Sequence, residues 1–445
     1  MWLLPFVSRL SRWAAHGYYR FAVAGPPTPV EGPVLYVANH PNSLVDPAFV
    51  AAAAGRPVRF LAKSPLFTDP VVGWLIRAAG AIPVYRRQDD PSLMDRNVST
   101  FEAAHEALAA GAAVGIFPEG LSHSDPSLAT LRTGAARIAL GAAAGGLGAA
   151  FPIVPVGIVL RRKERFRSRA LAVVGAAIRW DDLAGRAEED VEAVRELTAR
   201  IETALREVTV NLERWEDAPA VECAEAIYAA EFGLERDVAA RVKRLRQVTE
   251  GLGVLRRQDP ERLRGLYASV SRFAAVMEML GTTPAALDRL VRPRAAAGWV
   301  VRRLVYFGIL APLALVGHVL FAVPYWLTGR IESVVDLEPD VRATHKLLGG
   351  IAIYAGWIAL LAGALGLAAG RPWGLAALAA LPALGFLTQG VRDRWGRARA
   401  DARRWLLLRR RAALRARLLR RRAELAAELD ELRERLVIGG DGSYE

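Results

Sequence analysis

The segment NHPNSLVDP, residues 39–47, contains a histidine and an aspartate, His40 and Asp46, directly after the apolar run VLYVA. A histidine at the carboxyl end of a parallel strand lies at the sheet edge where α/β proteins form their clefts. Neutral imidazole can accept a hydroxyl proton there, and a carboxylate on its other ring nitrogen fixes the tautomer and stabilises the cation. The pair therefore suits general base chemistry, although one histidine and one aspartate at this spacing are more often structural.

A glutamate follows a second apolar run in the segment FPEG, residues 117–120. Gly120 allows a tight turn and the close approach of a ligand, so Glu119 is available at the same kind of strand end. A carboxylate in this position can equally cap a turn or a helix, which is the competing structural interpretation.

Two further segments lie between and after these motifs. GAIPVYRR, residues 80–87, brings Arg86 and Arg87 towards the same edge, and guanidinium groups bind phosphate oxygens bidentately. These arginines predict a phosphorylated acceptor if they face the cleft, and exposed surface arginines are the alternative. FPIVPVGI, residues 151–158, is an apolar strand with two prolines, which suits a sheet edge or a tunnel wall.

The elements that must position these residues are short apolar strands that alternate with helices from Val34 to Ile178. This alternation predicts an α/β domain with a largely parallel sheet and flanking helices. The predicted strands cover residues 34–38, 58–62, 81–84, 112–117, 153–160 and 170–178. The clearest predicted helices cover residues 92–110 and 133–144.

Taken together and in this order, the four blocks resemble the phospholipid and glycerol acyltransferase family, over roughly a third of the chain. Members of that family carry a block with His and Asp, a block with arginine, an FPEG block and a proline-bearing apolar strand. NHPNSLVDP, and FPEG followed by SHS, are most similar to the branch that acylates glycerol 3-phosphate or dihydroxyacetone phosphate. Five residues separate His40 from Asp46, where four are commonest in the family, and the longer spacing is associated with the same branch.

The resemblance implies a glycerolipid-acyltransferase-like sheet and a role for each matching residue. His40 would be the general base, Asp46 its orienting carboxylate and Arg86 a phosphate ligand. The acceptor site would be formed by residues of the FPEG block and the loop after it, which are Glu119, Gly120, Ser122 and His123.

The implied reaction is direct transfer of a fatty acyl group from an acyl thioester, either acyl-CoA or acyl carrier protein, to a hydroxyl group. The acceptor would be glycerol 3-phosphate or a lysophospholipid such as lysophosphatidate, in phospholipid biosynthesis. His40 would remove the hydroxyl proton as the oxygen attacks the thioester carbonyl, and backbone amide groups near the strand ends would stabilise the oxyanion. The mechanism requires no covalent acyl-enzyme, metal or redox cofactor.

Two other functions compete with this interpretation. GLSHS, residues 120–124, suggests a serine hydrolase with Ser122 as its nucleophile, but Ser124 replaces the closing glycine of the G-x-S-x-G motif. The second alternative is a membrane scaffold that keeps an acyltransferase fold without turnover. The intact residues of the family blocks argue against a scaffold.

The composition fits a protein with a globular part and membrane segments. The chain has 445 residues, enough for two or three structural units, and 53% of them are hydrophobic, with a mean hydropathy of +0.19. Its single cysteine, Cys223, excludes an intrachain disulfide and a zinc site built from cysteines.

The positive charge is concentrated near the C-terminus. Of the net charge of +13, a balance of +12 comes from residues 392–422, which contain 14 arginines and two aspartates. A basic stripe directly after apolar spans indicates contact with the anionic headgroups of a lipid bilayer and argues against nucleic acid as a partner.

Composition divides the chain into five parts. Residues 1–24 predict a membrane-associated helix, because arginines are interspersed among aromatic and leucine side chains, with an ordinary packing helix as the alternative. Residues 25–185 contain the acyltransferase-like α/β domain, and residues 186–300 form a charged helical linker or cap region. Residues 301–390 contain transmembrane segments, and residues 391–445 form a basic cytoplasmic helix and tail.

The apolar stretches predict a multi-pass membrane protein. Residues 304–327 and 347–369 are each long enough to span the bilayer, and residues 373–390 are borderline. Arginines flank both ends of this region, so the positive-inside rule places the flanks and the catalytic domain in the cytoplasm and requires an even number of crossings. The segment 373–390 is then expected to be re-entrant or interfacial. Leucines at coiled-coil-like spacing in residues 418–436 allow a partner helix or self-association, with a solvated amphipathic end as the alternative.

Overall fold

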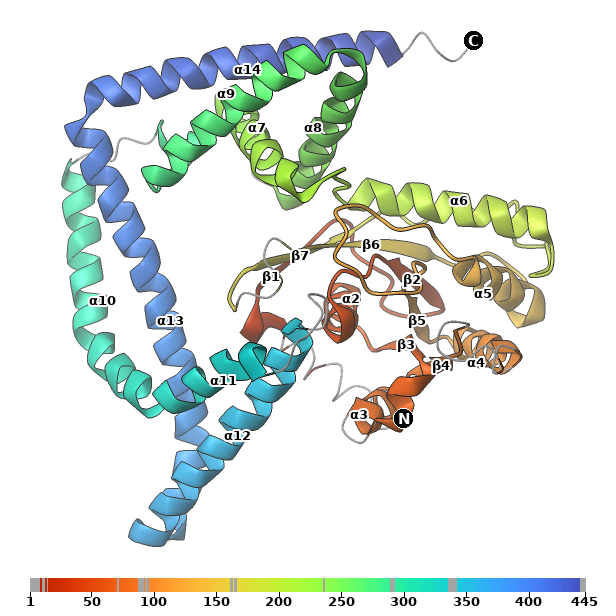
Figure 1. Ribbon diagram of the computed structural model, residues 1–445. Helices are drawn as coiled ribbons and strands as arrows, with labels where there is room; N and C mark the ends of the chain where they lie inside the picture. Colours follow the sequence, from red (N-terminus) through yellow and green to blue (C-terminus); the bar gives the residue numbers. More distant parts are fainter. Residues whose placement is uncertain are drawn as a thin grey trace. The chain divides into compact units, whose positions relative to one another are not determined.

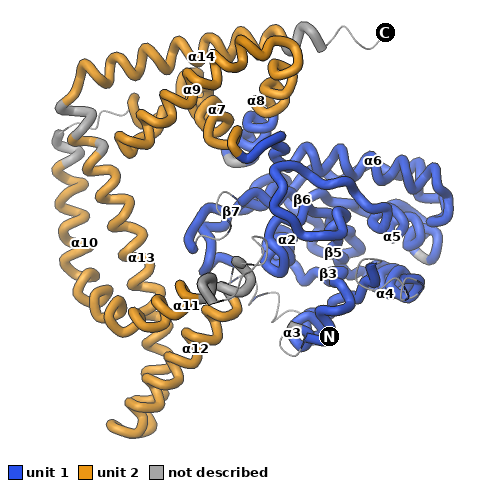
Figure 2. Tube along the Cα trace, viewed as in Figure 1, with its two compact units in different colours: residues 1–215, 237–246, 337–344 blue, residues 216–236, 247–336, 345–445 orange. Residues whose placement is uncertain are grey.

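The computed structural model describes residues 9, 13, 15–69, 72–86, 92, 95, 97–160, 163, 166–234, 237–288, 293–334 and 342–440. The chain forms two compact units (Figure 2). The first contains residues 1–215, 237–246 and 337–344, and the second contains residues 216–236, 247–336 and 345–445. All residues predicted to carry chemistry belong to the first unit.

The first unit is built on a seven-stranded sheet with the strand order β1-β7-β6-β2-β5-β3-β4 (Figure 1). Its strands are β1 (Arg20–Ala24), β2 (Val34–Ala38), β3 (Val58–Lys63), β4 (Ile82–Val84), β5 (Ala113–Ile116), β6 (Ile153–Leu160) and β7 (Arg169–Val174). Neighbouring strands are parallel, except that β6 and β7 form an antiparallel pair. The predicted α/β fold with a largely parallel sheet and flanking helices is therefore confirmed, and all six predicted strands are present.

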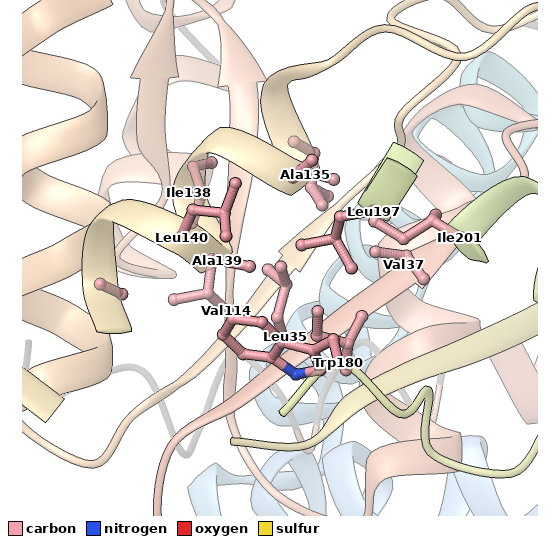
Figure 3. Close-up of a cluster of buried hydrophobic side chains, with 14 of the residues drawn as sticks. Leu35, Val37, Val114, Ala135, Ile138, Ala139, Leu140, Trp180, Leu197 and Ile201 are labelled. Atoms are coloured by element: carbon pink, nitrogen blue, oxygen red, sulfur yellow. The ribbon is translucent and has the colours of Figure 1, made fainter. Parts of the chain in front are cut away.

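Helices pack on this sheet in two groups. α4 (Asn97–Ala109), α5 (Gly134–Ala142) and α6 (Val191–Val208) surround a core that contains Leu35 and Val37 of β2 (Figure 3). α2 (Asp46–Ala54) packs against β6 and β7 outside that core, where Phe49 stacks on Phe21 of β1. A short helix, α3 (Val72–Ala78), follows β3. Because β2 and β5 are buried along their full length, their sequences are continuous apolar runs.

Helix α6 lies within residues 186–300, the predicted linker or cap region, but it belongs to the core of the sheet. Its buried apolar stripe consists of Val194, Leu197, Ile201, Leu205 and Val208. Asp190 caps the helix by accepting hydrogen bonds from the backbone N–H groups of Glu192 and Ala193. The unit that contains the sheet therefore extends to Trp215, beyond the boundary at residue 185 that composition indicates.

The N-terminal segment also differs from its prediction as one helix over residues 1–24. Its described part is helical at residues 15–18, whereas Arg20–Ala24 form the edge strand β1. In the strand, the backbone groups of these residues form hydrogen bonds with β7 in a parallel ladder. At the end of a short helix, the same groups would have only solvent as a partner. Residues 1–8, 10–12 and 14 lie outside the described residues, so membrane association of this segment stays a prediction.

Strand β6 is an interior strand, which corrects the expectation that its prolines suit a sheet edge; the alternative of a tunnel wall stays a prediction. It pairs in parallel with β2 and antiparallel with β7. β7 ends at Val174, which lies opposite Val156, so no residue of β7 lies opposite Pro155. The proline nitrogen, which has no hydrogen to donate, points to this side, and no hydrogen bond between β6 and β7 is lost there. On that side the Pro155 carbonyl still accepts a hydrogen bond from the N–H of Gly175.

In the second unit, a group of helices packs around a core of its own. α7 (Ala218–Glu231), α9 (Pro260–Met279) and α14 (Ala412–Gly440) share this core. α8 (Val238–Gln258), whose residues up to Arg246 belong to the first unit, connects α7 to α9. Arg422 of α14 is almost completely buried and pairs with Glu231 and Asp288. The leucine spacing of the basic C-terminal helix therefore reflects partner helices of the same chain and not a solvated amphipathic end.

Among the residues that the structure describes, three helices are long and apolar enough to cross a membrane, within residues 297–320, 348–369 and 371–403. They belong to α10 (Pro293–Leu320), α12 (Arg342–Ala369) and α13 (Arg371–Arg410), and α11 (Ala322–Val334) lies between the first two. The segment 373–390, expected to be re-entrant or interfacial, is part of the continuous helix α13. Pro372 lies in the first turn of this helix, which begins at Arg371, and does not interrupt it because the first turn needs no N–H donor there.

The core of the second unit constrains the number of crossings. α7 and α9 precede the candidate spans and α14 follows them, yet their side chains pack together. Helices that share a core lie on the same side of a membrane. We therefore expect an even number of crossings, with one of the three candidate helices not crossing completely.

Cysteine labelling in sealed vesicles tests this expectation. Native Cys223 is buried, and burial raises the pKa of its thiol to about 11, so it should react poorly. Arg195→Cys on α6 and Glu434→Cys on α14 introduce exposed thiols before and after the candidate spans. An impermeant maleimide should label both from the same side, with labelling in detergent as the control. Labelling from opposite sides would demonstrate an odd number of crossings.

Candidate active site

The sheet brings the predicted site residues to one edge. His40 follows β2, Arg86 follows β4 and Glu119 follows β5, each within three residues of the end of its strand. Because β2 and β5 are adjacent parallel strands, the loops that follow them meet. Hydrogen bonds connect these loops and their neighbours, and they bring together all seven predicted residues: His40, Asp46, Arg86, Glu119, Gly120, Ser122 and His123.

Asp46 reaches back to His40 through a tight local turn. The His40 Nδ1 atom lies 2.8 Å from Asp46 Oδ2, and the backbone N–H of Asn42 donates to the same oxygen at 2.7 Å. One 3₁₀ turn, Ser43–Val45, precedes α2, whose first residue is Asp46. Ser43 adopts a left-handed conformation with φ of 47°, which is uncommon for serine and tightens this turn. The five-residue spacing therefore closes on the imidazole and supports Asp46 as its partner.

An aromatic stack orients the imidazole. The His40 ring lies on the Phe117 ring with centroids 4.0 Å apart and planes 11° apart, and Phe60 stacks on Phe117 in turn. Gly115 leaves room for this stack, because a Cβ atom there would lie 2.4 Å from the Phe60 ring. With Nδ1–H directed to the Asp46 carboxylate, Nε2 is the basic ring atom, and none of the described residues forms a hydrogen bond with it.

The Asp46 carboxyl is completely buried. Burial raises the pKa of this carboxyl above its ordinary value, and hydrogen bonds from His40 and Asn42 and the charge of Lys163 oppose the rise. A raised pKa means that the fold is most stable with the acid protonated. That stability is lost as the pH rises from the ordinary pKa, about 4, through the folded value. A buried carboxyl whose ionised form is destabilised in this way is typical of functional sites.

Glu119 connects the two loops that form the site. Its side chain is only 2% exposed, and both carboxylate oxygens accept hydrogen bonds. Oε1 accepts from the backbone N–H of His40 at 2.7 Å, and Oε2 accepts from the backbone N–H of Ala129 at 2.7 Å and from His123 Nε2 at 2.5 Å. This geometry supports an indirect role in the acceptor site, in which Glu119 places the backbone of His40.

His123 is the second imidazole of the site, in the opposite tautomer. The backbone N–H of Asp125 donates to Nδ1 at 3.1 Å, so Nε2 carries the hydrogen that Glu119 accepts. The hydrogen bond to Glu119 raises the pKa of His123, and burial opposes this rise. The backbone N–H of His123 also donates to the carbonyl of His40 at 3.2 Å. Both backbone groups of His40 are therefore bound to the FPEG loop.

Ser122 does not have the surroundings of a hydrolytic nucleophile. Its hydroxyl accepts a hydrogen bond from the backbone N–H of Ser43 at 3.0 Å, and no described histidine hydrogen-bonds to it. A nucleophile elbow leads from a strand straight into a helix, whereas here β5 ends at Ile116 and α5 begins only at Gly134. The geometry gives the serine hydrolase alternative no support.

Arg86 lies beside the FPEG turn. Its Nη1 donates to the carbonyl of Gly120 at 3.0 Å, and Gly120 has φ of 73°, a left-handed conformation that favours glycine. A guanidinium has five N–H donors, so this bond is compatible with the predicted binding of a phosphate. Arg87, the other arginine of this block, lies outside the described residues.

Sequence reasoning missed two residues that support the site. Lys163 Nζ donates to the carbonyl of Pro41 at 2.7 Å and to the hydroxyl of Ser124 at 2.6 Å, so it connects the same two loops as Glu119. The Asn39 side chain pairs with both backbone groups of Ile158 and extends the ladder between β2 and β6. Lys163 follows β6 by three residues, so the strand-end rule used for β2 and β5 would have found it.

The arrangement can carry out proton transfer next to an anionic ligand. A neutral imidazole with its Nδ1–H bonded to a buried carboxylate can accept a hydroxyl proton at Nε2. Arg86 and Lys163 place two positive charges on the loops around it, and both are suited to phosphate oxygens.

Comparison with known proteins agrees with this chemistry. Residues 20–159 match the family model described as Acyltransferase. The chain is 27% identical over 272 residues to glycerol-3-phosphate O-acyltransferase 2 of Saccharomyces cerevisiae, a match covering 60% of this chain and 36% of the yeast protein. It is 29% identical over 141 residues to a chloroplastic 1-acyl-sn-glycerol-3-phosphate acyltransferase of Arabidopsis thaliana, covering 30% of this chain and 36% of that protein.

A solved structure is also similar, that of the 1-acyl-sn-glycerophosphate acyltransferase of Thermotoga maritima. It has a TM-score of 0.34 and 21% sequence identity, over 46% of this chain and 78% of that chain. The chain spans little more than a third of the length of the two curated relatives above.

Glu119→Gln tests the structural role of this carboxylate. An amide has one acceptor oxygen, so its NH₂ group would face a backbone N–H in either orientation. Leaving a buried donor unsatisfied costs about 1–3 kcal/mol, so the melting temperature in detergent should fall by several degrees. Glu196→Gln is the matched control, because Glu196 forms an exposed ion pair with Arg200 on α6. Equal melting temperatures of the two variants would contradict the role of Glu119.

Proposed function

Residues 20–159 are a domain of the acyltransferase family, and from this premise we propose that the protein transfers a fatty acyl group from an acyl thioester to the hydroxyl of a glycerol phosphate or lysophospholipid. The observation that carries the proposal is the hydrogen bond between His40 Nδ1 and the buried Asp46 carboxylate at the end of β2. It provides a general base within the segment that matches the family.

The reaction needs one proton carrier. His40 Nε2 takes the proton of the acceptor hydroxyl as that oxygen forms a bond to the thioester carbonyl carbon. When the tetrahedral intermediate collapses, the carbon–sulfur bond breaks and the leaving thiolate takes the proton from the imidazolium. Asp46 stabilises the imidazolium between these steps, and the face of the Phe117 ring adds an attractive cation–π contact. The donor would be acyl-CoA or acyl carrier protein.

The acceptor is proposed from the charge around the base. Arg86 follows β4 and donates a hydrogen bond to the loop that contains Glu119, whereas Lys163 follows β6 and donates one to the loop that contains His40. Both side chains favour a phosphate group. The yeast relative is named for glycerol 3-phosphate and the Arabidopsis relative for 1-acylglycerol 3-phosphate. The compounds in both names have a phosphate close to a free hydroxyl, so glycerol 3-phosphate and lysophosphatidate are the acceptors to test.

A membrane setting follows from the second unit. Three candidate spans precede or include the arginine-rich stretch of residues 392–422, which would bind anionic headgroups. We propose that the catalytic domain faces the cytoplasm, where acyl thioesters are available, on the side where the positive-inside rule places the arginines.

His40→Ala tests the mechanism. Loss of a general base should lower kcat by about 10² to 10⁴. The variant should still fold, although its melting temperature should fall by a few degrees because the buried Asp46 carboxyl loses its imidazole partner. Purified protein in vesicles would be given labelled acyl-CoA with glycerol 3-phosphate or lysophosphatidate, and the labelled lipid product measured. His16→Ala, an exposed histidine of the same unit, is the control. Near-native turnover of the His40 variant would eliminate the mechanism.

Arg86→Ala tests the phosphate contact. A contact made equally in the ground and transition states contributes to binding, so KM for the phosphorylated acceptor should rise while KM for the thioester stays near its native value. Arg200→Ala, on α6, controls for the loss of one positive charge. If only the thioester KM rose, Arg86 would belong to the donor site.

A further inference from the structure

Tyr19 lies beside the candidate active site although it is far from it in the sequence. β6 and β7 are antiparallel, so the start of β7 lies at the edge where β6 ends. β1 is parallel to β7, and its start therefore lies at this edge too. Tyr19 is the residue directly before β1, and this topology places it next to the loop after β2.

The Tyr19 hydroxyl connects to the His40–Asp46 pair through one residue. It accepts a hydrogen bond from Asn42 Nδ2 at 2.9 Å and donates to the carbonyl of Lys163 at 2.5 Å. The backbone N–H of Asn42 is the group that donates to Asp46 Oδ2, the oxygen that binds His40. Two residues, Asn42 and Asp46, therefore lie between the phenol and the imidazole in this chain of hydrogen bonds.

The surroundings of Tyr19 fix its position. Its side chain is 0% exposed and its ring contacts Phe49 edge-on, with centroids 5.3 Å apart. Backbone hydrogen bonds hold both neighbours, because Arg167 N–H donates to the carbonyl of Tyr18 at 2.6 Å and Arg20 N–H donates to the carbonyl of Ser168 at 2.8 Å. The ring is therefore held between the start of β1 and the start of β7, and it offers a fixed acceptor to Asn42.

Asn42 depends on this acceptor. Its side chain is 0% exposed, and within the described part of the chain Tyr19 is its one hydrogen-bond partner, since Asn42 Oδ1 has none. A buried amide that loses its last partner is expected to move to find another. Any such movement shifts the Asn42 backbone N–H, which holds Asp46.

We propose that Tyr19 is a positioning residue for the candidate general base, acting through Asn42 on the alignment of Asp46 with His40. The proposal rests on the acyl transfer proposed above. It adds Tyr19, the residue directly before β1, to the groups that position the base, so the catalytic alignment requires β1 to be docked on β7.

The test is Tyr19→Phe compared with Tyr36→Phe. Both side chains are completely buried and both changes remove one hydroxyl, but Tyr36 lies within β2 with its hydroxyl near Thr28 and Arg56. Tyr19→Phe should lower kcat by about 10- to 100-fold, a loss of the size found when the outer hydrogen-bond partners of metal ligands are removed. KM values should change little, and Tyr36→Phe should retain native kcat.

A double-mutant cycle with Asn42→Ala identifies the route. If Tyr19 acts through Asn42, the double variant should lose no more kcat than Asn42→Ala alone. Losses that multiply, a Tyr19→Phe effect confined to KM, or a kcat no lower than that of Tyr36→Phe would overturn the proposal. Absence of acyl transfer by the native protein with both acceptors, or native turnover of His40→Ala, would instead reject the proposed function.

Discussion

The buried carboxylate of Glu119 accepts hydrogen bonds from His40, Ala129 and His123, and the candidate active site depends on them. A buried carboxylate is tolerated only when its oxygens have donors, so these donors must converge. The bond to the His40 backbone places that residue where its ring lies on Phe117 and its Nδ1 reaches Asp46. The FPEG block therefore positions the backbone of His40, and both carboxylate oxygens of its glutamate are already occupied by hydrogen bonds.

Much of the sheet could be predicted because its central strands are buried on both faces. β2 and β5 are continuous apolar runs, and the polar residues directly after them mark the carboxyl ends of the strands. The sequence thus indicated His40 and Glu119 at one edge. It also indicated Asp46 by resemblance, and a left-handed Ser43 explains why a five-residue spacing still closes. Local patterns were sufficient wherever position along a strand determined position in space.

The remaining features depend on pairings that periodicity does not encode. The antiparallel pairing of β6 with β7 turns the start of β1 towards the site, so Tyr19 could not be placed from a parallel pattern. The prolines of β6 indicated an edge strand, because proline cannot donate a hydrogen bond to a neighbouring strand. β7 ends before it reaches Pro155, so an interior strand can contain this proline. α6 shows a charged surface with one apolar stripe, and only the core reveals that this stripe covers the sheet. In each case a distant segment supplies the deciding contact.

Asp46 and Glu119 are both buried, but their environments differ in a way that suits their roles. Glu119 has donors on both oxygens, whereas Asp46 Oδ1 has no partner among the described residues, and burial raises the pKa of the Asp46 carboxyl. A carboxylate with few donors gains most from a new positive charge nearby, because the interaction is strong where water is excluded. In the proposed mechanism, proton transfer to His40 would create that charge on a ring whose Nδ1 lies 2.8 Å from Asp46, during the reaction and not before it. Under that mechanism the incomplete solvation of Asp46 would favour the transition state over the ground state, which is the condition for faster chemistry.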